Sequence, residues 1–181
     1  MCPGEDVSRL PNHEFEKLAL PLLDSLYNFA RWLSSDAEEA RDLVQETFVK
    51  ALKGFAGFQE GTNFRAWMFR ILRNTFLTSK SGLEQRNTLQ ADEDGLEDAA
   101  VDPQTPELAL LRRADTELVR KAIAQLSPPF KEVLLLADIE EMKYQEVADA
   151  LNIPIGTVMS RLARARKQVR GYISGTVGGK P

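Results

Sequence analysis

The sequence predicts an all-α protein with two small helical domains joined by a flexible acidic linker. Apolar residues recur at spacings of three and four along most of the 181 residues, and no segment shows the strict alternation typical of a strand. The pattern fails near the middle, where an acidic run contains no basic residue and consists of Asp92, Glu93, Asp94, Glu97, Asp98, Asp102 and Glu107. A segment this polar cannot form a core of its own, so we expect a solvated linker.

These limits divide the chain into five parts. We expect an N-terminal tail over 1–11, a first domain over 12–80, the linker over 81–106, a second domain over 107–174 and a C-terminal tail over 175–181.

The first domain should contain three amphipathic helices. The first begins near Asn12, with a bend expected at Pro21, and its apolar stripe is Phe15, Leu18, Leu22, Leu26, Phe29 and Leu33. Ser35 followed by Glu38 is a capping box, which predicts the start of the second helix. The third helix runs from about Asn63 to Lys80 and is expected to bury Phe64, Trp67, Met68, Ile71 and Leu72.

The second domain should begin with a helix whose apolar residues are Leu108, Leu111, Leu118, Ile123 and Leu126. Ser127 before Pro128 is typical of an N-cap with proline in the first turn, so another helix should follow. Two last helices are expected over 144–151 and from 155 to about 172, separated by a three-residue turn. Lys143 is a poor capping residue for the first of this pair.

The last two helices have the outline of a helix-turn-helix, whose second helix enters the major groove of DNA. The expected core of the pair is Val147, Leu151, Ile153, Val158 and Leu162. We predict base or near-base contacts from Thr157, Ser160, Arg161 and Arg164, and phosphate contacts from Arg166, Lys167 and Arg170. The alternative is a solvated cationic helix with no DNA contact.

Charge is unevenly distributed along the chain. The net charge of −4 and the pI near 5.2 exclude uniform wrapping of nucleic acid, yet no acidic residue follows Asp149 while basic residues continue to Lys180. With one cysteine, Cys2, and one histidine, His13, we expect no intrachain disulfide, no Cys/His metal cluster and no cofactor. This composition and the lack of a recognisable signal peptide favour a cytoplasmic protein. Because no run approaches about 18 apolar residues, we also expect no membrane insertion.

Cations and aromatic rings alternate along one line of the third predicted helix, which consists of Arg65, Phe69, Arg73, Phe76 and Lys80. Rings stack on unpaired bases while cations follow the backbone, so this line predicts a surface for single-stranded DNA. The alternative is that Phe69 and Phe76 are simply core residues.

Four segments together resemble a known family. Residues 42–48 (DLVQETF) resemble the polymerase-binding signature of sigma-70 family region 2, and residues 60–67 (EGTNFRAW) resemble the promoter-melting stretch that follows it. Residues 144–148 (YQEVA) and 155–162 (IGTVMSRL) resemble the region 4 helix-turn-helix. No counterpart of regions 1.1 and 3 is found, which is typical of the small extracytoplasmic-function (ECF) sigma factors.

This resemblance implies roles by position. Core RNA polymerase would be bound, through the clamp helices of its largest subunit, by Asp42, Leu43, Gln45, Glu46 and Phe48. Thr62 and Asn63 would receive a base flipped from the minus-10 element, and the last helix would read the minus-35 element. The sequence is also similar to oxidative-stress sigma factors held inactive by zinc-containing anti-sigma proteins, which implies an anti-sigma partner and a stress regulon.

Three other classes of function fit the sequence less well. A conventional helix-turn-helix regulator usually needs a dimer to read two half-sites, and no heptad seam or ligand domain is evident. An enzyme is disfavoured because there is no phosphate-binding glycine loop and no recognisable nucleophile motif. A pure interaction scaffold would leave the arginines of the last helix without a role.

Overall fold

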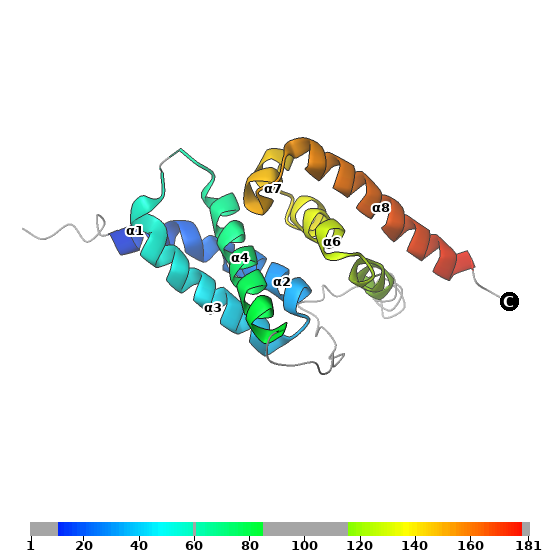
Figure 1. The fold of residues 1–181 in the computed structure, drawn as a ribbon, viewed down its shortest axis with the longest axis horizontal. Coiled ribbons are helices and arrows are strands. Elements are labelled where there is room, and N and C mark those ends of the chain that lie inside the picture. The colour runs from blue at the N-terminus through cyan, green and yellow to red at the C-terminus, as the bar shows by residue number, and fades with distance from the viewer. Residues whose placement is uncertain (1–10, 60, 85–115, 179–181) are drawn as a thin grey trace, which may run out of the picture. The chain divides into compact units, whose positions relative to one another are not determined.

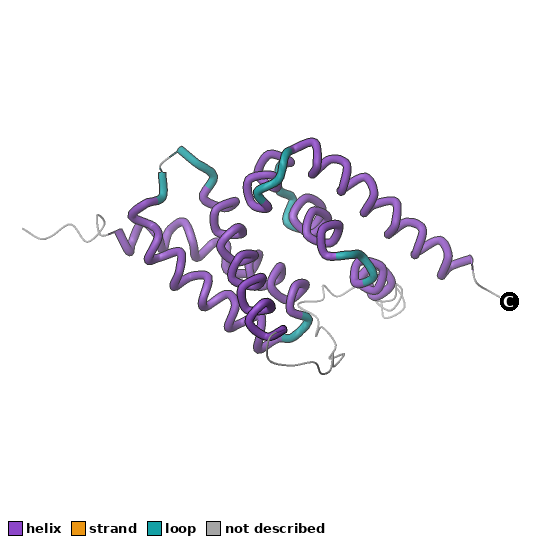
Figure 2. Tube along the Cα trace, in the orientation of Figure 1, coloured by secondary structure: helices purple, strands orange, loops and turns teal. Residues whose placement is uncertain are grey.

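The computed structural model describes residues 11–59, 61–84 and 116–178 (Figure 1). With the exception of Asp149–Asn152, the described residues up to 84 form one compact unit and those from 116 onward form another. Helices make up all the regular structure of these residues (Figure 2), which confirms the all-α prediction. The acidic run, Leu108 and Leu111 lie outside the described residues.

The described part of the first unit contains four α-helices and two short 3₁₀ turns. Their order is α1 (Pro11–Ala19), η2 (Leu20–Leu22), α2 (Leu23–Ser34), α3 (Ala37–Gly54), η3 (Phe55–Gly57) and α4 (Phe64–Glu84). The bend expected at Pro21 is confirmed, because this proline lies in the 3₁₀ turn that separates α1 from α2. α3 packs against both α2 and α4, and α2 also contacts α4, so the unit has one shared core.

The start of α3 differs from the prediction by one residue. Ser35 ends α2 in the left-handed conformation, with φ 62°, and its backbone amide donates to the Arg31 carbonyl. Asp36 is therefore the N-cap of α3, and its carboxylate accepts a hydrogen bond from the Glu39 amide at 2.7 Å. The capping box of Ser35 and Glu38 was a wrong assignment, because the serine is already used to close the preceding helix.

The buried face of α4 differs in part from the predicted one, and the helix is longer than predicted. Met68, Phe69 and Leu72 are fully buried, whereas Phe64, Trp67 and Ile71 are only half-buried. The half-buried Phe64 and Trp67 instead join an aromatic cluster at one end of the unit, together with Phe15, Phe55 and Phe58. α4 continues to Glu84, so the helix runs past the predicted domain boundary at Lys80.

The second unit begins, within the described residues, with a helix over 116–124. It continues with α6 (Pro128–Leu134), the π-helical turn η4 (Leu135–Ile139), α7 (Tyr144–Leu151) and α8 (Ile155–Gly178). As predicted, Ser127 is the N-cap residue of α6 and proline follows it directly. Its backbone is extended, but its hydroxyl makes no capping hydrogen bond. α8 packs along α6, which gives the unit its core.

The weak cap predicted at Lys143 is compensated from inside α7. The Glu146 carboxylate accepts a hydrogen bond from the Lys143 backbone amide at 2.7 Å. This is the reciprocal half of a capping box, and it fixes the first turn of α7 although residue 143 has no capping side chain.

Candidate nucleic-acid interface

α7, a short turn and α8 form the predicted helix-turn-helix. Asn152 ends α7 in the left-handed conformation, with φ 53°, and the Ile153 amide reaches back to the Ala148 carbonyl at 3.1 Å. The Pro154 carbonyl then accepts hydrogen bonds from the amides of Thr157 and Val158 at the start of α8. The turn is therefore closed on both sides by backbone hydrogen bonds, which fixes how α8 leaves α7.

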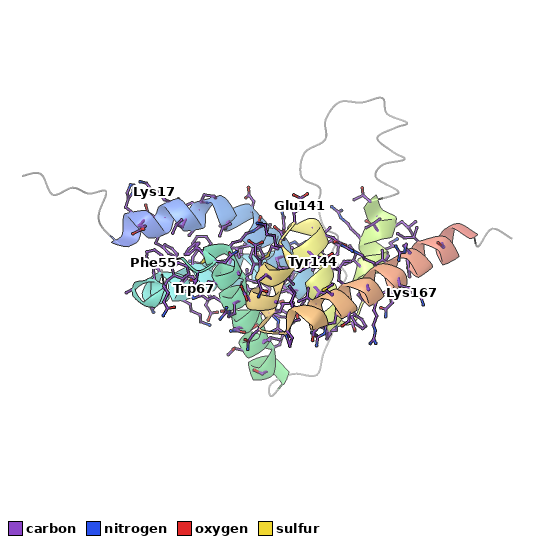
Figure 3. All side chains as sticks on the ribbon, turned by 90° about the horizontal axis from the view of Figure 1, so that it is seen from above. Lys17, Phe55, Trp67, Glu141, Tyr144 and Lys167 are labelled. Atoms are coloured by element: carbon purple, nitrogen blue, oxygen red, sulfur yellow. The ribbon has the colours of Figure 1, made fainter. Side chains whose placement is uncertain are left out.

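The buried and exposed side chains of α8 largely agree with those predicted from the spacing of its apolar residues. The buried side chains of this helix pair are Val147, Ala148, Ala150, Leu151, Val158, Leu162 and Ala165, and Ile153 is half-buried. Ser160, Arg164, Lys167 and Arg170 are exposed, and Thr157 and Arg161 are half-buried; Figure 3 labels Lys167 on this helix. The outward face of α8 can thus bring several cations and two hydroxyl groups to a polyanion.

Arg166 does not belong to this outward set. Its guanidinium donates two hydrogen bonds to Asp138 on η4, from Nη2 to Oδ1 at 2.6 Å and from Nε to Oδ2 at 2.9 Å. These bonds raise the pKa of Arg166 above its ordinary value, against an opposing effect of burial. The charge of Arg166 is already matched by a carboxylate of the same unit, so a phosphate contact from Arg166 stays a prediction that competes with this ion pair.

The line of cations and rings on α4 is only partly available to a ligand. Phe69 is 1% exposed and packs edge-on against Phe29, with ring centroids 5.5 Å apart. It has no free ring face for a base, so its predicted contact with DNA was wrong. Arg65, Arg73, Phe76 and Lys80 are half-buried, and two of the cations lie over rings: Arg65 over Phe69 at 5.8 Å and Lys80 over Phe76 at 5.5 Å.

The loop before α4 places two further predicted residues. Gly61 has φ 89°, a conformation that favours glycine, and Thr62 donates its hydroxyl to the Gln59 carbonyl at 2.7 Å. Asn63 precedes α4 and its side-chain oxygen accepts a hydrogen bond from the Ala66 amide at 2.9 Å. Both side chains thus have defined positions beside the start of α4, Thr62 exposed and Asn63 half-buried.

A cavity of about 550 Å³ lies between α2 and α3 on the first unit. Its lining residues are Leu23, Asp24, Tyr27, Arg41, Val44, Gln45, Phe48 and Val49. Gln45 and Phe48 were predicted from the sequence as binding residues. The α2 side of the cavity was missed, and the available signal was Leu23, an apolar residue that remains 43% exposed.

The other predicted binding residues of α3 lie outside this cavity lining. Asp42 and Glu46 are exposed, and Glu46 forms an ion pair with Lys50 at 2.7 Å. Leu43 is 5% exposed and belongs to the core, so its predicted direct contact with a partner is corrected. It holds α3 in the unit rather than presenting a side chain outward.

Comparison with known proteins gives two family matches in the same order along the chain. The family described as "Sigma-70 region 2" matches residues 18–84, and "Sigma-70, region 4" matches residues 116–169. Together they cover most of both compact units.

Individual relatives agree with these matches. The ECF RNA polymerase sigma factor SigE of Mycolicibacterium smegmatis is 32% identical over 171 residues, and the aligned part is 93% of this chain but 64% of that relative's length. The ECF RNA polymerase sigma factor EcfG of Rhodopseudomonas palustris is 35% identical over 158 residues, covering 86% of this chain and 84% of the relative. Among solved structures, the sigma factor RpoE from Bartonella quintana, crystallised with the anti-sigma factor NepR, is 31% identical with a TM-score of 0.67, covering 89% of this chain and 97% of that one.

The fold and the site define a helical protein of two units whose second unit carries a helix-turn-helix. The chain belongs to the ECF group of the sigma-70 family of RNA polymerase sigma factors. Within the described residues, no helix is long and apolar enough to cross a membrane.

Proposed function

We propose that this chain binds core RNA polymerase through its first unit and directs it to promoters through two DNA-binding surfaces, without catalysing a reaction itself. The observation that supports this most is the presence of both sigma regions in one chain, each on its own compact helical unit. A conventional helix-turn-helix regulator would account for the second unit but would leave the region 2 match on the first unit without a role.

The cavity between α2 and α3, called the groove from here on, is the proposed polymerase-binding surface. Its lining combines apolar and aromatic side chains, among them Phe48 and Val49 from α3 and Tyr27 from α2, with polar ones such as Arg41 and Gln45. An apolar centre with a polar rim is the usual anatomy of a protein–protein interface. Asp42 and Glu46, exposed on α3 nearby in sequence, extend this surface with negative charge.

The outward face of α8 is the proposed reader of the minus-35 duplex. Thr157, Ser160, Arg161 and Arg164 lie in its first three turns, the part of a recognition helix that meets base edges. Lys167 and Arg170 follow further along the helix and suit phosphate contacts.

The loop before α4 is the proposed contact for the unpaired minus-10 strand. Thr62 and Asn63 lie there, and the half-buried cations Arg65, Arg73 and Lys80 continue along α4 with the ring of Phe76. A base flipped out of the duplex is bound by hydrogen bonds to its edge and by stacking, which these residue types can supply.

We also propose control by an anti-sigma protein in the cytoplasm. The Bartonella quintana relative was crystallised with such a protein, which supports the class of partner. The oxidative-stress subgroup, the zinc in the partner and a stress regulon remain predictions from sequence resemblance. Because Cys2 is the chain's one cysteine, it cannot form an intrachain disulfide switch, so any redox sensing should reside in the partner.

Reconstitution with core polymerase tests the proposed function. The purified chain and core enzyme should produce transcripts from a defined set of genomic start sites, and sequencing the transcript 5′ ends should reveal shared elements near positions −35 and −10. The chain alone should bind the same duplexes weakly, because its net charge of −4 reduces general attraction to phosphate. Tight and specific duplex binding by the chain alone, with no effect of core polymerase, would favour the regulator instead.

A further inference from the structure

Asp138 and Arg166 join two elements that are separate in sequence. Asp138 lies on the π-helical turn η4 and Arg166 lies on α8, 28 residues further along the chain. Their two hydrogen bonds, at 2.6 and 2.9 Å, join two guanidinium nitrogens to the two carboxylate oxygens, which is the bidentate arrangement of this pair. This geometry restrains the direction of both side chains as well as their distance.

The ion pair ties the proposed DNA-reading helix to the segment just before α7. Arg166 of α8 is bound by Asp138 of η4, and η4 ends at Ile139, shortly before α7 begins at Tyr144. These contacts lie outside the buried core of the helix pair, since Arg166 follows the buried Ala165.

The solvent exposure of the Asp138 and Arg166 side chains bears on whether the pair stabilises the fold or orients α8. The side chains of Arg166 and Asp138 are 42% and 31% exposed, and ion pairs so open to solvent contribute little to the stability of a fold. A small shift in the direction of α8, in contrast, is amplified at the base edges, because hydrogen bonds to bases depend steeply on distance and angle. The pair is thus placed to affect orientation more than folding.

We propose that Asp138 and Arg166 are positioning residues for promoter recognition, setting the direction of α8, and that Arg166 is not a phosphate contact. This inference rests on the proposed function of α8 as the minus-35 reader. Asp138 fixes the guanidinium, and the remaining cations of α8 are left to meet DNA. Lysine at position 166 would not serve, because a single ammonium cannot form the bidentate pair of bonds.

Charge reversal tests the pair. Arg166→Asp, Asp138→Arg and the double variant are each assembled with core polymerase, and binding to a promoter fragment carrying the minus-35 and minus-10 elements is measured. We expect about a tenfold loss of affinity for Arg166→Asp, equivalent to about 1.4 kcal/mol. The double variant, which has the wild-type net charge and restores an opposite-charge pair, should recover most of this loss. Without any recovery in the double variant, the positioning role is wrong.

The salt dependence of binding gives a second, independent readout. Each phosphate contact contributes about 0.9 to the slope of log affinity against log salt concentration. Arg166→Met should lower affinity several-fold with an unchanged slope, whereas the control Lys167→Met should reduce the slope by about one contact. A reduced slope for Arg166→Met, or unchanged affinity, would overturn the inference. Because it needs no charge reversal, this variant decides the question even if Arg166→Asp disturbs the second unit.

The wild-type protein separates this inference from the function on which it rests. If the wild-type chain with core polymerase shows no promoter binding, the proposed function fails. If it binds and only the predicted behaviour at positions 138 and 166 is missing, the positioning role alone fails.

Discussion

The side-chain oxygen of Asn63 accepts a hydrogen bond from the backbone amide of Ala66 at 2.9 Å, so the residue proposed to meet the unpaired promoter strand also caps α4. A capping residue satisfies an amide that has no partner within its own helix. Any variant at position 63 can therefore change the stability of α4 as well as a contact with DNA. The two effects have to be separated before a role in promoter opening is assigned.

A pair of variants separates them. Asn63→Ala removes the cap and should lower the free energy of unfolding by about 1 kcal/mol, while Asn63→Asp keeps an oxygen acceptor at the cap and should stay close to wild type. Both should slow promoter opening, because alanine has no polar group for a base and aspartate cannot donate a hydrogen bond. Urea denaturation and permanganate footprinting of unpaired thymines measure the two effects. Wild-type opening by Asn63→Asp would remove Asn63 from the minus-10 surface.

Substitution of a residue that lines the groove between α2 and α3 should weaken polymerase binding. Val49 lines the groove and is 46% exposed, so Val49→Lys should leave the fold intact but place a charge in an apolar contact. We expect at least a tenfold weaker association with core polymerase, measured by fluorescence titration of the labelled chain. The matched control is Leu77→Lys, since Leu77 is 44% exposed on α4 and does not line this groove. Equal losses from both variants would mean that the groove is not the binding surface.

Phe69 and Phe76 should now behave differently, although they were predicted as members of one line. Phe69→Ala opens a cavity in the core and should reduce the free energy of unfolding by about 3–5 kcal/mol, measured by urea denaturation. Phe76 is half-buried, so Phe76→Ala should cost clearly less stability, and its main effect should be on binding to a single-stranded minus-10 oligonucleotide in the presence of core polymerase. A small stability loss for Phe69→Ala would contradict its place in the core.

The difference between Phe69 and Trp67 shows what helix periodicity cannot decide. The stripe with Trp67 and the line with Phe69 both have helical spacing, so the sequence shows two candidate inward faces and does not say which neighbours cover them. α4 packs against α2 as well as α3, and this double contact buries Phe69 while Trp67 stays half-buried at the aromatic cluster. The helix-turn-helix was predicted more accurately, because its core residues and its turn lie close together in sequence, so the local pattern is enough to indicate which residues meet.

Long-range pairings were beyond the reach of the sequence for a related reason. Arg166 has the spacing of an outward cation, and nothing local indicates that a carboxylate 28 residues earlier will meet it. The groove likewise requires α2 and α3 to be placed side by side, so of its lining residues only Gln45 and Phe48 were named from the sequence. The polymerase contact itself came from resemblance, since the charged face of α3 alone is equally compatible with simple solvation.

The residues of α8 proposed to contact bases and those proposed to contact phosphates should respond differently to substitution. Arg161 and Arg164 lie early on α8, so replacing either by alanine should cost about 1–3 kcal/mol of binding if it contacts a base bidentately, and should relax the choice of base at that minus-35 position. Lys167→Ala and Arg170→Ala should instead weaken all promoters alike and reduce the salt dependence. Binding measured over a set of minus-35 variants, at two or more salt concentrations, distinguishes these outcomes.

A template with a premelted bubble over the minus-10 region separates the upstream surface from the downstream one. Opening the duplex and extruding a base costs a few kcal/mol, and the bubble removes part of this cost in advance. It should therefore rescue part of the opening defect of Asn63→Asp, but none of the defect of Arg161→Ala, whose contacts are made to duplex DNA. Both variants are compared with wild type on duplex and bubble templates by permanganate footprinting and promoter binding. Equal rescue of both variants would mean that Arg161 and Asn63 act on the same step, and that the division between the minus-35 surface on α8 and the minus-10 surface before α4 is wrong.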